Sequence, residues 1–200
     1  LLPRFVAILE GTPRKPAQVR RIIERILNAR LADSLMFWTE DHTRLPLGKF
    51  GRLQDITFHE RLGSMEEKTQ RLSQLSQSLA DAWQLTQEER KHLERACLLA
   101  KYDLLSAMVK EFPTLQGVVG NYYARDSEEP QEVAKAIEEH YLPVGERLPK
   151  TLIGSALAIL DKYDTLSSYF GIGIQPTGDQ DPFGLRRGKG ARTDGRRWIV

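Results

Sequence analysis

The sequence predicts an all-α fold, a bundle of six or more helices. Apolar residues recur at helical spacing in several long segments, and capping residues or prolines precede most of these segments. No segment shows the strict alternation of apolar and polar residues that is typical of a half-buried strand. With 200 residues, 40 % of them hydrophobic and 28 % charged, the chain is long enough for one substantial core, or for one core and an appendage.

The N-terminal elements are expected in the following order. The apolar run 4–9 reads as the end of a strand from an upstream unit, and residues 10–16 read as a linker. Pro16 is well placed as the first residue of a helix that runs to about Glu40. A turn follows, and then a short helix around 51–59.

Two capping boxes of the form Ser/Thr-x-x-Glu predict the next helices. The box at 64–67 begins a helix that ends near Trp83, and the box at 86–89 begins a second helix. This second helix contains the stretch "ACLLAKYDLLSAMV" (96–109) and should stop before Pro113, because a proline disfavours helical geometry in the preceding residue.

Two further helices are expected in the C-terminal part. Pro130 begins the first, residues 142–149 form a loop, and an apolar helix covers about 151–169. The segment 171–182 is rich in glycine and proline and predicts a loop, after which Asp181 caps another helix.

The charge of the chain is small but uneven. The net charge is +2, yet residues 185–200 hold six basic residues against Asp194 alone, and residues 1–30 hold seven against two glutamates. Basic ends on an acidic body favour contact with phosphate groups; the alternative is an ordinary solvated surface with a basic tail. The single cysteine, Cys97, rules out a disulfide framework and fits a reducing, cytoplasmic location. No run of eighteen apolar residues or signal peptide is found, so no membrane contact is expected.

The stretch 96–109 places Lys101 and Asp103 among apolar residues, where a carboxylate is costly to bury without a partner. A metal site is not expected, because no two histidines have helical ligand spacing. There is also no Gly-x-Ser-x-Gly elbow and no phosphate-binding GxxxxGK[ST] loop. The chain therefore offers no catalytic residue by its own pattern. The side chains that would have to supply a metal site are His42, His59, His92, His140, Asp103, Asp161 and Asp164.

Several segments resemble one protein family. They include "ARLADSLMFWTED" (29–41), "FHERLGSMEEKTQRL" (58–72), "EFPTLQG" (111–117), "EEHYLP" (138–143) and "PTGDQDPFGLRR" (176–187). In this order they are similar to the β subunit of the bacterial heterotetrameric glycyl-tRNA synthetase, and the likeness extends from about Leu1 to Arg187. The resemblance implies an HD-domain-like helical bundle, which is part of an enzyme that ligates glycine to its tRNA with ATP. It further implies that the α subunit is the partner and carries catalysis, that glycine tRNA is bound, and that this domain holds no cofactor.

The resemblance also gives a meaning to the charged residues in the apolar stretch. An HD phosphohydrolase binds metal through a first histidine, a His-Asp doublet and a late aspartate. Here Lys68 stands at the first position, and Lys101 or Asp103 stands at the doublet, depending on register, while Asp161 matches the late aspartate. We therefore expect a degenerate site in which lysine replaces the ion and pairs with Asp103. A metal-dependent phosphohydrolase is the alternative.

Five arginines are the candidate RNA-binding residues. Arg186 and Arg187 lie near the start of the last expected helix, and Arg20, Arg21 and Arg25 form a second group. A solvated face, or salt bridges to another subunit, explains them equally well. In that case the domain is a scaffold that docks the α subunit without touching RNA.

The chain is expected to divide into three parts. Residues 1–15 are the end of an upstream domain or a linker, residues 16–187 form the helical domain, and residues 188–200 form a basic tail. The tail is rich in glycine and arginine and departs from the alanine-rich helix that the resemblance implies, so we expect it to be disordered.

Overall fold

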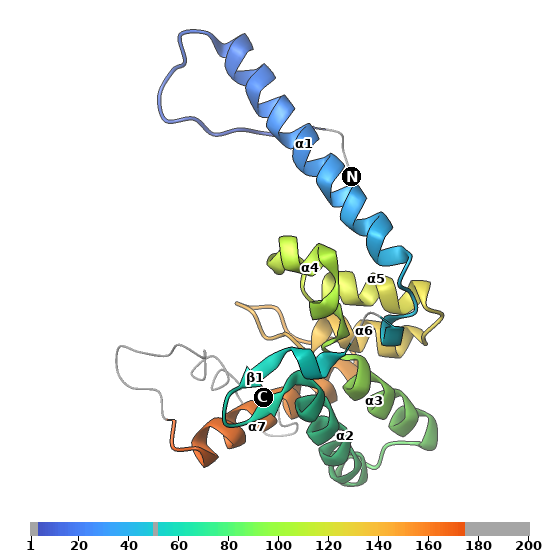
Figure 1. The fold of residues 1–200 in the computed structure, drawn as a ribbon. Helices are drawn as coiled ribbons and strands as arrows, with labels where there is room; N and C mark the ends of the chain where they lie inside the picture. Colours follow the sequence, from blue (N-terminus) through green and yellow to red (C-terminus); the bar gives the residue numbers. More distant parts are fainter. Residues whose placement is uncertain (1–3, 50–51, 175–200) are drawn as a thin grey trace.

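The structure is a computed structural model that describes residues 4–49 and 52–174. Within these residues the fold is all-α, as predicted: seven α-helices and one small two-stranded hairpin (Figure 1). The α-helices and strands are α1 (Pro16–His42), β1 (Thr57–His59), β2 (Gly63–Ser64), α2 (Met65–Ala82), α3 (Gln87–Leu99), α4 (Ala107–Glu111), α5 (Val118–Asp126), α6 (Gln131–Glu139) and α7 (Leu152–Gly171). Short 3-10 turns, η1 (Leu47–Lys49), η2 (Leu53–Asp55), η3 (Tyr102–Leu105) and η4 (Pro113–Leu115), lie between them.

The core of the molecule lies among four helices. α2 packs against α3 and α7, while α6 packs against α3, α5 and α7. Leu72, Leu93, Ile137 and Leu157, one from each of these four helices, are fully buried. Because these helices pack closely, a charged side chain that points between α2, α6 and α7 is buried and held in place.

α1 differs from the other long helices, because it projects away from this body (Figure 1). Its C-terminal end is bonded to the body by a buried carboxylate. The carboxylate of Asp41 accepts hydrogen bonds from the backbone N–H groups of Ala107 (2.8 Å) and Met108 (3.0 Å) and from the hydroxyl of Tyr123 (2.8 Å). Asp41 therefore anchors α1 to α4 and α5.

Most predicted helix starts are confirmed. α1 begins at Pro16, and α2 and α3 begin after Ser64 and Thr86 with both hydrogen bonds of each capping box formed. α6 and α7 also lie where they were expected. None of the helices in the described residues is both long enough and apolar enough to cross a membrane.

Three predictions about local structure are wrong. Residues 4–9 lie in no strand, and the helix expected around 51–59 is instead η2 followed by β1 of the hairpin. The helix expected to continue to Pro113 ends at Leu99. It ends there because Asp103 and Ser106 bond to the backbone: Asp103 binds the N–H of Gly117, and Ser106 caps α4.

α5 was not anticipated by the sequence analysis. It begins after Gly117, which has a positive φ of 80°. Residues with a side chain rarely adopt this backbone conformation. The helix expected after Asp181 lies outside the described residues.

Candidate functional site

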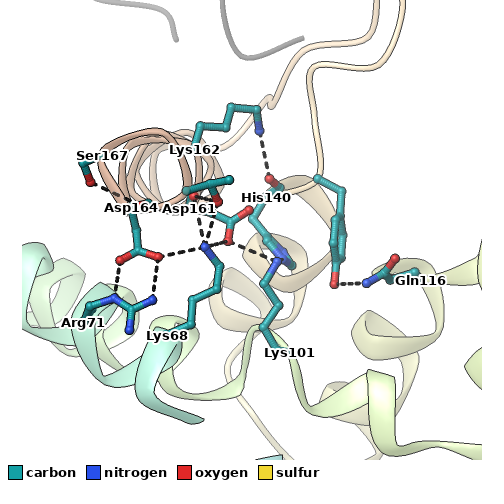
Figure 2. Close-up of polar contacts among 11 residues, drawn as sticks. Lys68, Arg71, Lys101, Gln116, His140, Asp161, Lys162, Asp164 and Ser167 are labelled. Atoms are coloured by element: carbon teal, nitrogen blue, oxygen red, sulfur yellow. Dashed lines mark hydrogen bonds and ion pairs between the residues drawn. The ribbon is translucent and has the colours of Figure 1, made fainter. Parts of the chain in front are cut away.

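A buried cluster of charged side chains lies where α2, η3, α6 and α7 meet (Figure 2). Lys68 on α2 and Lys101 at the start of η3 both approach the same carboxylate oxygen of Asp161, at 3.2 and 3.1 Å. Both lysine side chains are almost fully buried. We call this group, with Arg71, Asp164 and His140, the lysine–aspartate cluster.

Lys68 is fully engaged within the cluster. Its Nζ donates to Asp164 Oδ2 (2.9 Å), to the hydroxyl of Thr165 (2.8 Å) and to the main-chain oxygen of Asp161 (3.3 Å). Arg71, one turn further along α2, binds both oxygens of Asp164, at 2.6 and 3.2 Å. α2 and α7 are thus joined by four charged residues, two on each helix at i, i+3 spacing: Lys68 and Arg71 on α2, and Asp161 and Asp164 on α7.

His140 and Lys101 form the other side of the cluster. Lys101 Nζ lies 2.9 Å from His140 Nε2, and His140 Nδ1 lies 2.7 Å from the main-chain oxygen of Ile137. Burial and the charge of Lys101 hold the pKa of His140 well below its ordinary value. His140 is therefore a neutral imidazole that donates from Nδ1 to Ile137 and accepts from Lys101 at Nε2.

Asp161 carries the negative charge at the centre. Burial acts to raise the pKa of its carboxyl, but Lys101 and Lys68 outweigh burial and hold the pKa well below the usual range. The carboxylate is ionised and neutralised by two ammonium groups. Such a buried group of charges is stable only when each member keeps its partners.

Asp103 does not pair with a lysine, and this prediction is wrong. Its Oδ2 accepts a hydrogen bond from the backbone N–H of Gly117 (2.6 Å), whereas its Oδ1 is buried without a hydrogen-bond partner. Burial raises the pKa of Asp103 to about 6, although the Gly117 amide and the charge of Lys101 act to lower it. Gly120 lies against the same carboxyl, because a Cβ there would approach Asp103 Oδ2 to 3.1 Å.

The cluster does not fit a divalent cation. A cation of this kind needs carboxylate or imidazole ligands that converge on one point. Here two ammonium groups already face the carboxylate of Asp161, and His140 Nε2 faces one of them. No group of three or more His, Cys, Asp or Glu side chains in the described residues could hold a metal ion.

The candidate RNA-binding arginines fall into two sets. Arg20, Arg21 and Arg25 lie on the projecting part of α1, where Arg20 pairs with Glu24 one turn away (2.8 Å). Arg21 and Arg25 are exposed, and neither forms an ion pair within the part of the chain that the structure describes. Arg186 and Arg187 lie outside the described residues.

The sequence analysis named Lys68, Lys101 and Asp161 but missed Arg71 and the role of His140. Two spacings could have indicated Arg71: it follows Lys68 by three residues, as Asp164 follows Asp161. Side chains three residues apart share a helix face, so two cations could have been matched with two carboxylates. His140 gave no such indication, because its partner Lys101 is distant in the sequence.

Comparisons with known proteins agree with the resemblance stated above. The family model described as "Glycyl-tRNA synthetase beta subunit" matches residues 1–191. The chain is 47 % identical over 189 residues to a Trichodesmium erythraeum protein named "Glycine--tRNA ligase beta subunit", and 41 % identical over 189 residues to the Bacillus subtilis protein of the same name. Each match covers 94 % of this chain but only 26 % and 28 % of the relative. The chain thus spans about a quarter of the length of the curated relatives that it matches.

Proposed function

The chain belongs to the family of glycyl-tRNA synthetase beta subunits, and from this we propose that it is a non-catalytic, tRNA-binding helical domain of such a subunit. The domain is a degenerate relative of HD phosphohydrolases. Within the whole enzyme it helps to hold glycine tRNA while glycine is ligated to it with ATP. Catalysis and ATP use belong to the α subunit, and the complex works in the cytoplasm.

The observation that carries this proposal is the pair of lysines at Asp161. Lys68 and Lys101 approach the carboxylate to 3.2 and 3.1 Å and supply the positive charge that a metal ion supplies in an HD phosphohydrolase. A hydrolase needs the ion to activate water, and an ammonium group does not do so. The alternative function, a metal-dependent phosphohydrolase, is therefore disfavoured.

The RNA-binding role is supported by Arg21 and Arg25. They are spaced i, i+4 on α1, so their guanidinium groups lie on one face and are free to contact neighbouring phosphates. Tyr122 is half exposed and packs edge-on against Trp38 of α1, which makes it available to stack on an unpaired base. Tyr123 is buried and bonded to Asp41, and belongs to the core.

The test is the binding of glycine tRNA to the chain, measured by filter binding at several salt concentrations. We expect the affinity to fall steeply between about 50 and 200 mM salt, because phosphate contacts release counterions. The double variant Arg21→Ala/Arg25→Ala should bind more weakly and reduce the salt slope by about one to two. Arg186→Ala/Arg187→Ala tests the second set in the same way.

Lys91→Ala is the matched control, because Lys91 is an exposed cation on α3, away from α1. It should leave both the affinity and the salt slope unchanged. If neither arginine pair affects binding, or if the chain does not bind tRNA, the role is instead that of a scaffold that docks the α subunit. Metal in stoichiometric amount, together with hydrolysis of nucleotides, would point to the phosphohydrolase.

A further inference from the structure

The outer part of α1, residues 16–36, exposes large apolar side chains on two of its sides, among charged residues such as Glu24 and Asp33. Five large side chains on it are 57–66 % exposed, namely Ile22, Ile26, Leu31, Leu35 and Met36. The apolar residues are too concentrated on this one element to be the scattered exposed residues of an ordinary surface.

The helical positions divide these residues between two flanks. At 100° per residue, Ile22, Ile26 and Met36 fall on one side of the helix, and Leu31 and Leu35 fall on the other. The side between the flanks faces the body, because Arg30 pairs with Glu111 and Phe37 packs against Phe112.

The opposite side of the helix carries a polar strip that contains Arg21, Arg25 and Ala32. These residues lie about as far from the body-facing side as the helix allows. A protein that covered both flanks would therefore leave the polar strip open.

We propose that both flanks of α1 are covered by another part of the same β-subunit polypeptide, beyond the quarter of the family's length that this chain spans. The inference rests on the family membership and not on the tRNA-binding role. It assigns to α1 the position of a helix wedged between two parts of one chain, with the Arg21–Arg25 strip left open.

The size of the flanks favours an occupant from the same chain over a separate protein. The 21 residues of the outer part of α1 are about 32 Å long and about 10 Å wide, so a flank offers on the order of 300 Å². A stable interface between separate proteins needs roughly 800 Å² from each partner. A covalently linked segment needs less, because its local concentration is in the millimolar range and it loses less freedom on docking.

The segment that leads into α1 supports the same occupant. Val6 and Ile8 are more than nine-tenths exposed, although they are aliphatic. They lie on residues 4–15, the irregular segment that leads into the outer end of α1 (Figure 1). Two adjoining elements thus both lack the apolar contacts that a neighbouring part of the polypeptide would provide.

The test is cysteine reactivity in the full-length β subunit that contains this chain, with alkylation read peptide by peptide by mass spectrometry. Ile26→Cys and Leu31→Cys report the two flanks, and Ala32→Cys on the polar strip is the matched control. We expect the thiols at 26 and 31 to react at least several-fold more slowly than the thiol at 32. The protection should be present in the β subunit alone and should not change when the protein is diluted.

Cys97 reports folding in the same molecule, because it is buried and its thiol has a raised pKa. Met36→Cys repeats the measurement at a further flank position in case one variant misfolds. In addition, Ile26→Glu should restore the reactivity of Ile22→Cys, because a charge cannot be buried in an apolar contact.

Three results would overturn the proposal. The first is equal reactivity at 26, 31 and 32 in the β subunit. The second is protection that disappears on dilution, which assigns the flanks to a second copy. The third is protection that appears only after the α subunit or tRNA is added. Loss of tRNA binding in Arg21→Ala/Arg25→Ala leaves this measurement unaffected, so the two proposals fail separately.

Discussion

Single residues decide the chemistry of the lysine–aspartate cluster. Asp161 is a carboxylate of the kind that binds metal, but it faces two ammonium groups at 3.1–3.2 Å. Removing two charges from water costs several kcal/mol per ion, and the attraction between them offsets this only while the geometry is kept. The cluster therefore holds α2, η3 and α7 in register.

The first prediction concerns Asp161→Asn. The substitution leaves two buried lysines without their shared carboxylate, so the free energy of unfolding should fall by about 3–5 kcal/mol. Urea denaturation followed by circular dichroism measures the change. Glu24→Gln is the control: Glu24 forms an exposed pair with Arg20, and its loss should cost less than about 0.5 kcal/mol.

A double variant measures the interaction energy between Lys101 and Asp161 apart from the cost of losing either residue alone. Lys101→Met combined with Asp161→Asn should be less destabilised than the sum of the two single variants, because neither partner is left buried alone. Strict additivity would contradict a direct interaction between Lys101 and Asp161.

The second prediction is a pH dependence that originates from Asp103. The pKa of its carboxyl is about 6 in the folded protein, against an ordinary 3.8. Between these values the folded state binds the proton more tightly than the unfolded state, so the free energy of unfolding decreases as pH rises from about 4 to about 6. Above this range the contribution is constant.

Asp103→Asn removes this titration. The free energy of unfolding of the variant minus that of the parent should therefore increase by roughly 2–3 kcal/mol from pH 4 to pH 6.5. Chemical denaturation at each pH gives both values. A difference that does not change with pH would mean that Asp103 is ionised throughout.

At the scale of elements, the sequence predicted structure wherever a local interaction decides it. Ser64 and Thr86 cap their helices through residues only three positions away, and both capping boxes are present in the structure. The break after Leu99 could not be predicted in this way. It depends on the bond of Asp103 to Gly117, fourteen residues later, and on Asp41, which is sixty-six residues before Ala107.

The candidate site follows the same rule. Lys68, Lys101 and Asp161 were found through the family resemblance, which assigns positions, but the choice of partner was wrong for Asp103. A pairing between η3 and α7 depends on how four helices pack, and no local pattern encodes it. His140 is part of the cluster for the same reason, because its partner Lys101 is 39 residues away in the sequence.

The third prediction concerns the anchor between α1 and α4. Asp41→Ala removes an acceptor from two backbone N–H groups and from the Tyr123 hydroxyl, all of them at least partly buried. We expect a loss of about 2–4 kcal/mol in the free energy of unfolding, because the donors are left without partners. Asp33→Ala, also on α1 but exposed, is the control and should change stability by less than about 0.5 kcal/mol. Equal effects would mean that Asp41 does not anchor the helix.

At the scale of the whole molecule, the described residues form a packed body and one helix, α1, that only partly belongs to it. The body has a continuous core among α2, α3, α6 and α7. α1 contacts that body through its C-terminal half, including Arg30, Phe37 and Asp41. Since most of the stability of a helix in a protein comes from tertiary packing, the outer part of α1 should open independently of the body.

The fourth prediction is that amide hydrogen exchange in the 200-residue chain divides along this boundary. Amides of residues 19–30 have few buried contacts to break, so they should exchange after local opening that costs only about 0–1 kcal/mol. Amides of Leu93 to Leu99 on α3, whose side chains lie in the core, should exchange only on global unfolding, which costs at least about 5 kcal/mol. Mass spectrometry of peptic peptides resolves the two regions. If the amides of residues 19–30 were as protected as those of α3, α1 would already be covered in this chain. Protection of residues 19–30 that arises only in the full-length β subunit would instead identify the missing contacts as those of the same polypeptide.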